Sequence, residues 1–108
     1  MSLPIRVLPQ ADDDLEEIAV YIAGGSVDAA LRFLDAAQST ISGLLESPHQ
    51  GALLRTQNER LSGVRWVPVA GFNTYMVFYL ADTEVRVIRV LHGARDLPAL
   101  FDDENESS

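Results

Sequence analysis

The sequence predicts one α+β domain of the order β-α-α-β-β-β, in which an antiparallel sheet carries a helical hairpin packed on one face. Three observations support this prediction. Two segments in the first half of the chain repeat apolar residues at helical spacing. Three later runs are rich in β-branched and aromatic residues, as strands are. The links between those runs are short enough for hairpins, so the strands pair antiparallel and cover the apolar helix faces.

The N-terminal part is predicted to be an edge strand followed by a helix. Residues 5–8 form an apolar run that ends at Pro9, which fits a sheet edge and then the first position of a helix. Apolar side chains then recur at i, i+3, i+4 and i+7, as in an amphipathic helix. These side chains are Leu15, Ile18, Ala19 and Ile22. Gly24 and Gly25 end the helix.

A second helix is predicted to start at the N-cap residue Ser26 and to stop at Pro48. Its apolar stripe keeps the helical spacing and is widened by Phe33. The stripe consists of Val27, Ala30, Leu31, Leu34, Ala37, Ile41, Leu44 and Leu45. The two helices, joined by a Gly-Gly-Ser link, form an antiparallel hairpin.

Residues 49–60 have no periodicity and are predicted to be a loop. Strands are expected over residues 64–69, 74–81 and 85–92. In the last strand, counting by two places Val85, Val87, Arg89 and Leu91 on one face and Arg86, Ile88, Val90 and His92 on the other. Residues 4–100 are thus expected to form a single domain, and residues 101–108 an acidic, disordered tail.

The chain contains no cysteine, which excludes disulfides, cysteine-ligated zinc and a thiol nucleophile. His49 and His92 lack metal-ligand spacing, and the acids at residues 12–17 read as a solvated helix start. We therefore expect no cofactor and no metal. There is no apolar run of the roughly 18–20 residues that a membrane span needs and no signal-peptide pattern, so the sequence predicts a cytoplasmic protein.

The charge of the chain is acidic and uneven. The formal net charge is −8, and all eight basic residues are arginines. Residues 1–54 hold eight acids and two arginines, residues 55–95 six arginines and three acids, and residues 96–108 five acids. Because a basic footprint dominates nucleic-acid affinity, we expect no direct DNA binding by the chain alone. The lack of lysine also removes one common proton-transfer group.

Several short motifs follow one another along residues 5–98. They are Asp14-Leu15-Glu16-Glu17-Ile18 with Tyr21-Ile22, Arg32-Phe33, Pro48-His49-Gln50-Gly51, Gly63-Val64-Arg65 with Pro68-Val69, Tyr75-Met76-Val77-Phe78-Tyr79, and finally Val87-Ile88-Arg89-Val90-Leu91-His92-Gly93-Ala94-Arg95-Asp96. In this order they resemble the ParE/RelE toxin superfamily of type II toxin–antitoxin systems, and the last motif is typical of the ParE branch. Each motif is weak alone; their order and spacing carry the resemblance.

The resemblance implies a toxin whose cognate antitoxin, ParD-like or related, wraps it and covers its helical hairpin and sheet. ParE-like members typically poison DNA gyrase, and RelE-like members cleave messenger RNA in the ribosome. We expect a ParE-like toxin that acts by protein binding. Two alternatives stay open: a RelE-like ribonuclease, and a degenerate module that only binds its antitoxin. A homodimer of the isolated chain is compatible with its hydrophobic share.

The end of the last strand supplies the candidates for target binding, Arg89, His92 and Arg95. Arg89 among apolar neighbours is a local conflict that marks either a functional site or an arginine–carboxylate pair that holds the C-terminal segment. His92 has an equally simple reading as a hydrogen-bonded residue at a strand end. Gly93 is expected to allow a turn that other residues resist.

The candidates for antitoxin binding are Trp66, Tyr75, Tyr79 and Arg65. Alternatively, these side chains pack within the fold. Trp66 would then lie on a sheet face, and Tyr75 and Tyr79 would share one face with their hydroxyls at its margin. If the chain were a ribonuclease, Arg65 and Arg89 would clamp a phosphate and His92 would move a proton. RelE-like toxins use lysines and often a C-terminal tyrosine, and neither is present here. We therefore expect no catalytic residues.

Overall fold

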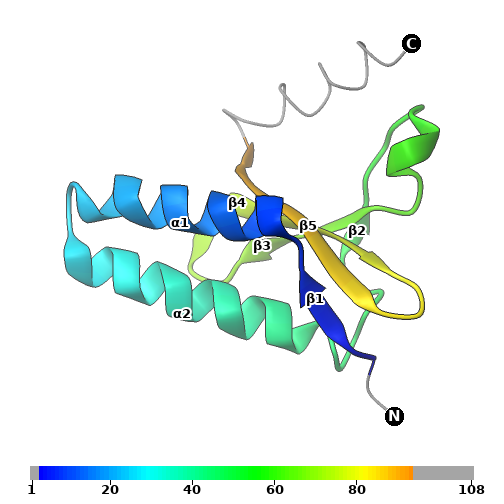
Figure 1. Ribbon diagram of the computed structural model, residues 1–108, viewed down its shortest axis with the longest axis horizontal. Coiled ribbons are helices and arrows are strands. Elements are labelled where there is room, and N and C mark those ends of the chain that lie inside the picture. The colour runs from blue at the N-terminus through cyan, green and yellow to red at the C-terminus, as the bar shows by residue number, and fades with distance from the viewer. Residues whose placement is uncertain (1–2, 94–108) are drawn as a thin grey trace.

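The computed structural model describes residues 3–93, and in it two antiparallel helices pack on one side of a five-stranded sheet (Figure 1). The strands are β1 (Ile5–Val7), β2 (Ala52–Leu53), β3 (Arg65–Val69), β4 (Phe72–Ala81) and β5 (Val85–His92). The helices are α1 (Pro9–Ala23) and α2 (Val27–Gly43), and η1 (Glu59–Leu61) is a 3₁₀ turn. The α+β class and the helical hairpin are confirmed.

The sheet is mixed, with the strand order β1-β5-β4-β3-β2, whereas the sequence predicted only antiparallel pairing. β1 runs parallel to β5, with Ile5 opposite Val85 and Val7 opposite Val87. Short turns dictate antiparallel pairing only between strands that follow each other in the chain. β1 is followed by the helices and meets β5 at long range, so no turn fixed its direction.

The segment predicted as a loop contains one short strand and one 3₁₀ turn. In β2, Ala52 and Leu53 pair antiparallel with Trp66 and Arg65. The 3₁₀ turn η1 begins after Asn58, whose side-chain oxygen accepts a hydrogen bond from the Arg60 N–H at 3.0 Å. Elements of two and three residues are too short to leave a periodic pattern, which is why the sequence did not reveal them.

The helix starts follow the local sequence. α1 has Pro9 at its first position and no side-chain cap, since Leu8 precedes it. α2 is capped by Ser26, whose Oγ accepts a hydrogen bond from the Ala29 N–H at 3.1 Å. Such a cap is worth about 1 kcal/mol. The link between the helices is therefore short and ends on a defined capping residue.

The inner core lies between the helices and the sheet. Phe33 of α2 is fully buried and meets Phe72 and Tyr75 edge-on, with ring centroids 5.4 and 5.2 Å apart. The other buried members of this core are Ala11, Ile18, Ala37, Ile41, Leu44, Val69, Val77, Tyr79, Val85, Val87 and Val90. The predicted helical stripes thus supply this core in part, and β4 and β5 supply the rest.

A second hydrophobic group, which we call the outer cluster, is separate from the inner core. Val64, Phe78 and Leu91 are buried in it. Leu54, Leu61, Trp66, Met76, Leu80 and Ile88 pack around them and are partly buried. Leu54 and Leu61 come from the segment between β2 and β3, so that segment helps to cover the side of the sheet that the helices leave open.

A β-bulge in β4–β5 changes which residues of β5 face the helices. Phe78 pairs with Arg89 but Tyr79 pairs with Val87, so Ile88 has no directly opposite residue. Beyond this point the alternation is shifted by one residue. Val90 joins the inner core and Leu91 the outer cluster. The faces predicted by counting through β5 are therefore wrong after Ile88, because an inserted residue breaks the period of two.

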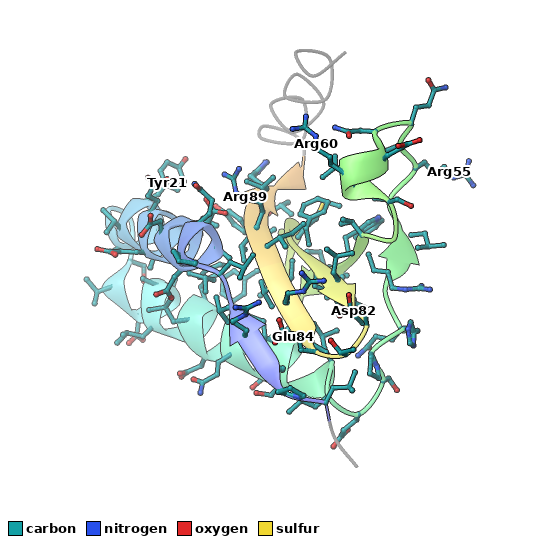
Figure 2. All side chains as sticks on the ribbon, turned by 45° about the vertical axis from the view of Figure 1, so that its right-hand side comes forward. Tyr21, Arg55, Arg60, Asp82, Glu84 and Arg89 are labelled. Atoms are coloured by element: carbon teal, nitrogen blue, oxygen red, sulfur yellow. The ribbon has the colours of Figure 1, made fainter. Side chains whose placement is uncertain are left out.

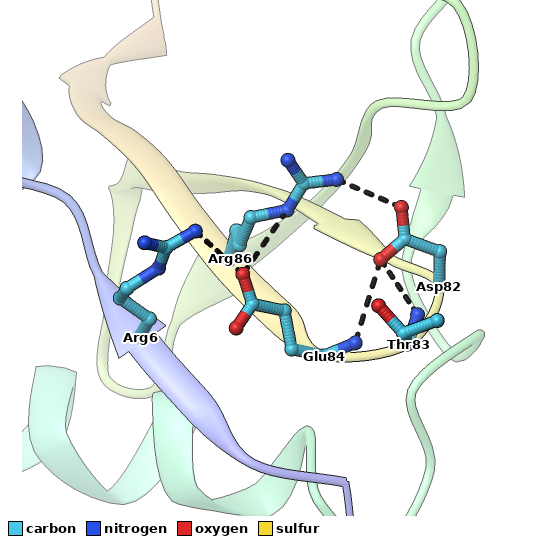
Figure 3. A network of polar contacts seen from close by, with 5 residues as sticks. All are labelled: Arg6, Asp82, Thr83, Glu84 and Arg86. Atoms are coloured by element: carbon cyan, nitrogen blue, oxygen red, sulfur yellow. Dashed lines mark hydrogen bonds and ion pairs between the residues drawn. The ribbon is translucent and has the colours of Figure 1, made fainter.

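Polar contacts fix the turn between β4 and β5 beside β1 (Figure 3). Arg6 and Arg86 are partners in the parallel pair, and Glu84 lies between their charges. Its Oε1 accepts a hydrogen bond from Arg6 Nη2 at 2.6 Å and lies 3.7 Å from Arg86 Nε. Arg86 Nη2 also donates to Asp82 Oδ2 at 2.8 Å. The carboxylates thus offset two like charges that the strand register places side by side.

Asp82 makes the stability of this turn depend on pH. Hydrogen bonds from the backbone N–H groups of Glu84 and Thr83 hold the pKa of its carboxyl below the usual value of 3.8, and Arg86 adds to this effect. A depressed folded-state pKa contributes stability above the unfolded pKa, and that contribution is lost as pH falls through the folded pKa. We expect Asp82→Asn to be less stable than the wild type at about pH 7 and the difference to shrink at about pH 2. Urea unfolding at both pH values measures this, and a difference that is constant with pH would contradict it.

Candidate interaction site at the end of β5

The end of β5 is tied to α1 through one carboxylate. Arg89 Nε donates to Asp14 Oδ2 at 2.8 Å, and Arg89 Nη2 donates to Asp14 Oδ1 at 3.1 Å. The backbone N–H of Val90 donates to the same Oδ2 at 3.0 Å. The contact is bidentate and charge-assisted, which is the strong form of hydrogen bond. Figure 2 shows Arg89 between α1 and β5, at the end of the strand away from Asp82 and Glu84.

Asp14 is buried, with only 6% of its surface exposed, so the expectation that residues 12–17 are simply a solvated helix start is wrong at this residue. Ala11, Asp14 and Ile18 are the buried residues of α1, and they follow helical spacing. The signal was present in the sequence, because Asp14 lies on the apolar stripe rather than beside it. Arg89 satisfies the carboxylate that this position buries.

His92 and Gly93 end the described part of the chain. The His92 ring meets Tyr75 edge-on, with centroids 5.3 Å apart, and the two residues are partners across the β4–β5 ladder. Gly93 does not have a positive φ, contrary to the expected turn role. A Cβ there would lie 2.7 Å from Met76 Sδ, so the Met76 side chain would have to shift to admit one. Arg95 and Asp96 lie outside the described residues.

Arg65 and Tyr79 both hold the backbone around Gly51. Arg65 Nη1 donates to the carbonyl oxygens of His49 at 3.2 Å and Gly51 at 2.8 Å. The Tyr79 hydroxyl accepts a hydrogen bond from the Gly51 N–H at 2.9 Å. A Cβ at Gly51 would lie 2.7 Å from that hydroxyl and 2.8 Å from the Trp66 carbonyl oxygen. Only glycine lets these strands and this segment approach so closely.

The four residues predicted to bind an antitoxin differ in exposure. Tyr79 is fully buried and Tyr75 nearly so, and both face the inner core as their spacing predicted. Trp66 and Arg65 are half-buried. Trp66 packs against the outer cluster, opposite Phe78 in the ladder. Only these last two present appreciable side-chain surface in this structure.

The conditional ribonuclease set is divided between two strands, with Arg65 apart from Arg89 and His92. Arg65 lies on β3 and Arg89 on β5, with β4 between them, which separates the two backbones by about 10 Å. The Arg65 guanidinium contacts His49 and Gly51, whereas that of Arg89 contacts Asp14. His92 packs on Tyr75, four residues along β4 from Tyr79, the partner of Arg65. Among residues 3–93 there is also no group of acids and histidines that could hold a metal ion.

The helical hairpin carries exposed apolar residues that the sequence had assigned to the core-facing stripe. Val27, Leu31 and Leu34 of α2 are 65%, 57% and 37% exposed. Val20, in the last turn of α1, was not part of a predicted stripe and is also exposed, at 68%. The real core face of α2 is narrower and consists of Ala30, Phe33, Ala37 and Ile41. Hydrophobic spacing alone does not show which part of a wide apolar stripe meets the sheet.

A double-mutant cycle measures the contact between α1 and β5. We expect Asp14→Ala and Arg89→Ala each to lower the free energy of unfolding by about 2 kcal/mol, because each removes charge-assisted hydrogen bonds at a partly buried site. The double variant should cost less than the two changes added, with a coupling of about 1–3 kcal/mol. Urea unfolding gives all four values.

The exposed pair of Arg6 and Glu84 is the matched control for that cycle. Its side chains are 60% and 26% exposed, so solvent screens their attraction. We expect a coupling below about 1 kcal/mol for Arg6→Ala with Glu84→Ala. Additive effects at Asp14 and Arg89 would show that their hydrogen bonds contribute little to holding the strand.

Tyr79→Phe tests the contact with Gly51. Removing the hydroxyl leaves the buried Gly51 N–H without its acceptor, which costs about 1–2 kcal/mol. The packing of the ring in the inner core is unchanged, so thermal unfolding isolates the loss of the hydrogen bond. No change in stability would show that another acceptor replaces the hydroxyl.

The comparisons with known proteins agree with this architecture. The family model described as the ParE toxin of the type II toxin–antitoxin system, parDE, matches residues 5–97. Among solved structures, the chain is similar to the chromosomal ParDE toxin–antitoxin system from P. aeruginosa, with a TM-score of 0.67 and 17% identity over 84% of this chain and 96% of that one. It is also similar to the toxin–antitoxin complex RelBE2 from Mycobacterium tuberculosis, with a TM-score of 0.53 and 24% identity over 85% of this chain and 99% of that one.

No curated protein matches the chain. The two structures share too little sequence with it to show more than the fold, and the fold is the one that the helical hairpin and the sheet display. The family match extends over nearly the whole described chain. The chain therefore belongs to the ParE toxin family of type II toxin–antitoxin systems.

Proposed function

We propose that this toxin inhibits DNA gyrase by binding to it and that a cognate, ParD-like antitoxin neutralises it. The observation that carries the proposal is the separation of Arg65, which lies on β3 and contacts Gly51, from Arg89 and His92, which lie on β5. General acid–base cleavage of RNA needs a proton acceptor and phosphate-binding cations around one reacting centre. Protein binding needs no such convergence, so this arrangement favours it.

The target-binding region is proposed at the end of β5, where Arg89 and His92 lie and from which the chain leads to Arg95. The Arg89 guanidinium is fixed by Asp14 on one side, while its side chain is still 30% exposed. An arginine held in one orientation loses little entropy when it meets a partner, which suits an interface anchor. The pair with Asp14 and a target contact are therefore compatible roles.

The antitoxin contact is proposed to include Trp66 and Arg65, which keep exposed surface beside the outer cluster. Aromatic and arginine side chains supply most of the anchoring energy of protein interfaces. Tyr75 and Tyr79 were predicted to contact the antitoxin as well, but a buried side chain offers a partner no surface. We assign both tyrosines to the support of the sheet.

Two truncations locate the toxic determinant. Ending the chain after Gly93 keeps every described element and removes Arg95, and we expect toxicity to be lost. Ending it after Leu100 removes only the acidic tail, and we expect toxicity to be kept. Each protein is induced alone in cells, which are scored for growth, double-strand DNA breaks and cut messenger RNA.

DNA breaks with intact message in the cells that make the full chain would support the gyrase proposal. Cut message would replace it with a ribonuclease, and healthy cells with neither lesion would indicate a module that only binds an antitoxin. Persistent toxicity after truncation at Gly93 would show that the target contact lies before residue 94.

A further inference from the structure

Met76 carries the only sulfur atom in the described part of the chain. The protein has no cysteine and two methionines, Met1 and Met76, and Met1 lies outside residues 3–93. Met76 lies on β4, pairs with Leu91 of β5 and packs against the outer cluster. It is partly exposed rather than buried, so small molecules can approach its side chain from solvent.

The Met76 sulfur lies against the point where β5 ends. A Cβ at Gly93 would be 2.7 Å from Sδ and 3.7 Å from Cγ, so the thioether occupies the space beside that glycine. The carbonyl oxygen of Thr74 lies beside the same space, 3.6 Å from that Cβ. From Gly93 the chain leads to Arg95, a candidate for target binding. Met76 therefore contacts the chain at the start of the proposed target-binding region.

The end of β5 is also held by contacts that do not involve sulfur. On the side of α1, Asp14 Oδ2 accepts a hydrogen bond from Arg89 Nε at 2.8 Å. From the inner core, the Tyr75 ring meets the His92 ring edge-on. Of these described contacts, only that of Met76 is made by a readily oxidised group. A mild oxidant would therefore change one side of this end of the strand and leave the others in place.

We propose that Met76 is an oxidation site through which hydroperoxides release the end of β5. The sulfur attacks one oxygen of hydrogen peroxide, so that an S–O bond forms and the O–O bond breaks. The proton of the transferred oxygen goes to the departing hydroxide, which leaves as water. Sulfur thereby loses two electrons to the peroxide, and the product is methionine sulfoxide. The change is reversible, because methionine sulfoxide reductases remove the oxygen again.

The sulfoxide oxygen suits the surroundings of this sulfur poorly. A polar oxygen that is buried without a hydrogen-bond donor costs free energy. The Thr74 carbonyl oxygen beside Gly93 is itself an acceptor, and the outer cluster consists of hydrophobic residues. The methionine side chain is flexible, so the sulfoxide can turn toward water. In doing so it leaves Gly93 and Leu91, and the end of β5 loses its cover on the outer side of the sheet.

This release would alter the region through which we propose that the toxin binds its target. To that extent the inference rests on the proposed function. The oxidised toxin should act more weakly on its target than the reduced toxin, since the residues after Gly93 no longer start from a fixed position. The oxidation itself and the release of the strand are independent of any target.

Oxidation of the full chain by hydrogen peroxide tests whether the site is accessible in the folded protein. Mass spectrometry of proteolytic fragments measures the gain of about 16 Da at Met76 over time, with and without urea. We expect the rate in the folded protein to be within about tenfold of the rate in the unfolded chain, because Met76 is partly exposed. Oxidation that occurs only after unfolding would show that the fold seals the sulfur and would overturn the inference.

Two variants separate the polarity of the side chain from its size. Met76→Leu keeps an apolar side chain of similar volume, and Met76→Gln places a polar one of similar length there. We expect amide hydrogen exchange at residues 91–93 to be at least about tenfold faster in the oxidised protein and in Met76→Gln than in Met76→Leu. Exchange in α2 should be equal in all three, and this equality also checks that each protein is folded.

Treatment with methionine sulfoxide reductase should restore slow exchange in the oxidised wild type, and peroxide should leave exchange in Met76→Leu unchanged. Equal exchange at residues 91–93 in the oxidised and reduced wild type would overturn the release of β5, even if Met76→Gln did not fold. Faster exchange throughout the chain would do the same, because it would indicate general destabilisation.

Inhibition of gyrase supercoiling is the separate functional measurement. We expect peroxide to weaken inhibition by the wild type and to leave inhibition by Met76→Leu unchanged. Unchanged inhibition by the oxidised wild type would overturn the link to target binding. If neither the reduced nor the oxidised protein inhibits gyrase, the proposed function fails, whereas the mass and exchange measurements still decide whether Met76 is the oxidation site.

Discussion

One carboxylate, that of Asp14, joins the two layers of this protein where β5 ends. It accepts two hydrogen bonds from the Arg89 guanidinium and one from the Val90 N–H, so helix and strand are held at both side-chain and backbone level. The β-bulge lies directly before this point. The Val90 N–H that follows it donates to Asp14. The helix thus supplies to β5 an acceptor outside the ladder, and the residues that follow start from a fixed position.

Much of the fold could be predicted because the relevant signals are local. Pro9, Ser26 and the repeating apolar residues mark helix starts and faces, and short turns mark the β3–β4 and β4–β5 hairpins. The parallel pairing of β1 with β5 could not be predicted, since it joins residues about 80 positions apart. Nor could the bulge, because Val85–His92 alternates plausibly without one and only the ladder reveals the unpaired Ile88.

The sequence predicted which residues belong to the candidate site better than it predicted where their side chains lie. Arg89 stood out as a charge among apolar neighbours, and a carboxylate pair was one of the two readings, but nothing local named Asp14 as the partner. Tyr75 and Tyr79 were correctly placed on one face, yet their depth depends on how the helices cover that face. The exposure of Leu31 depends on the same covering. The burial of a side chain depends on how the helices and the sheet pack together, and the sequence of either layer alone does not show this packing.

The acidic surface of the helices has a consequence for how toxin–antitoxin pairs stay separate within one cell. Related pairs share a fold, so shape alone permits a toxin to be captured by the wrong antitoxin. A helical layer with six exposed acids and one arginine repels any neutralising segment that is itself acidic. Such repulsion acts during diffusional approach, before close contacts form. The exposed carboxylates of the helices therefore select against acidic neutralising segments, and this selection weakens as ionic strength rises.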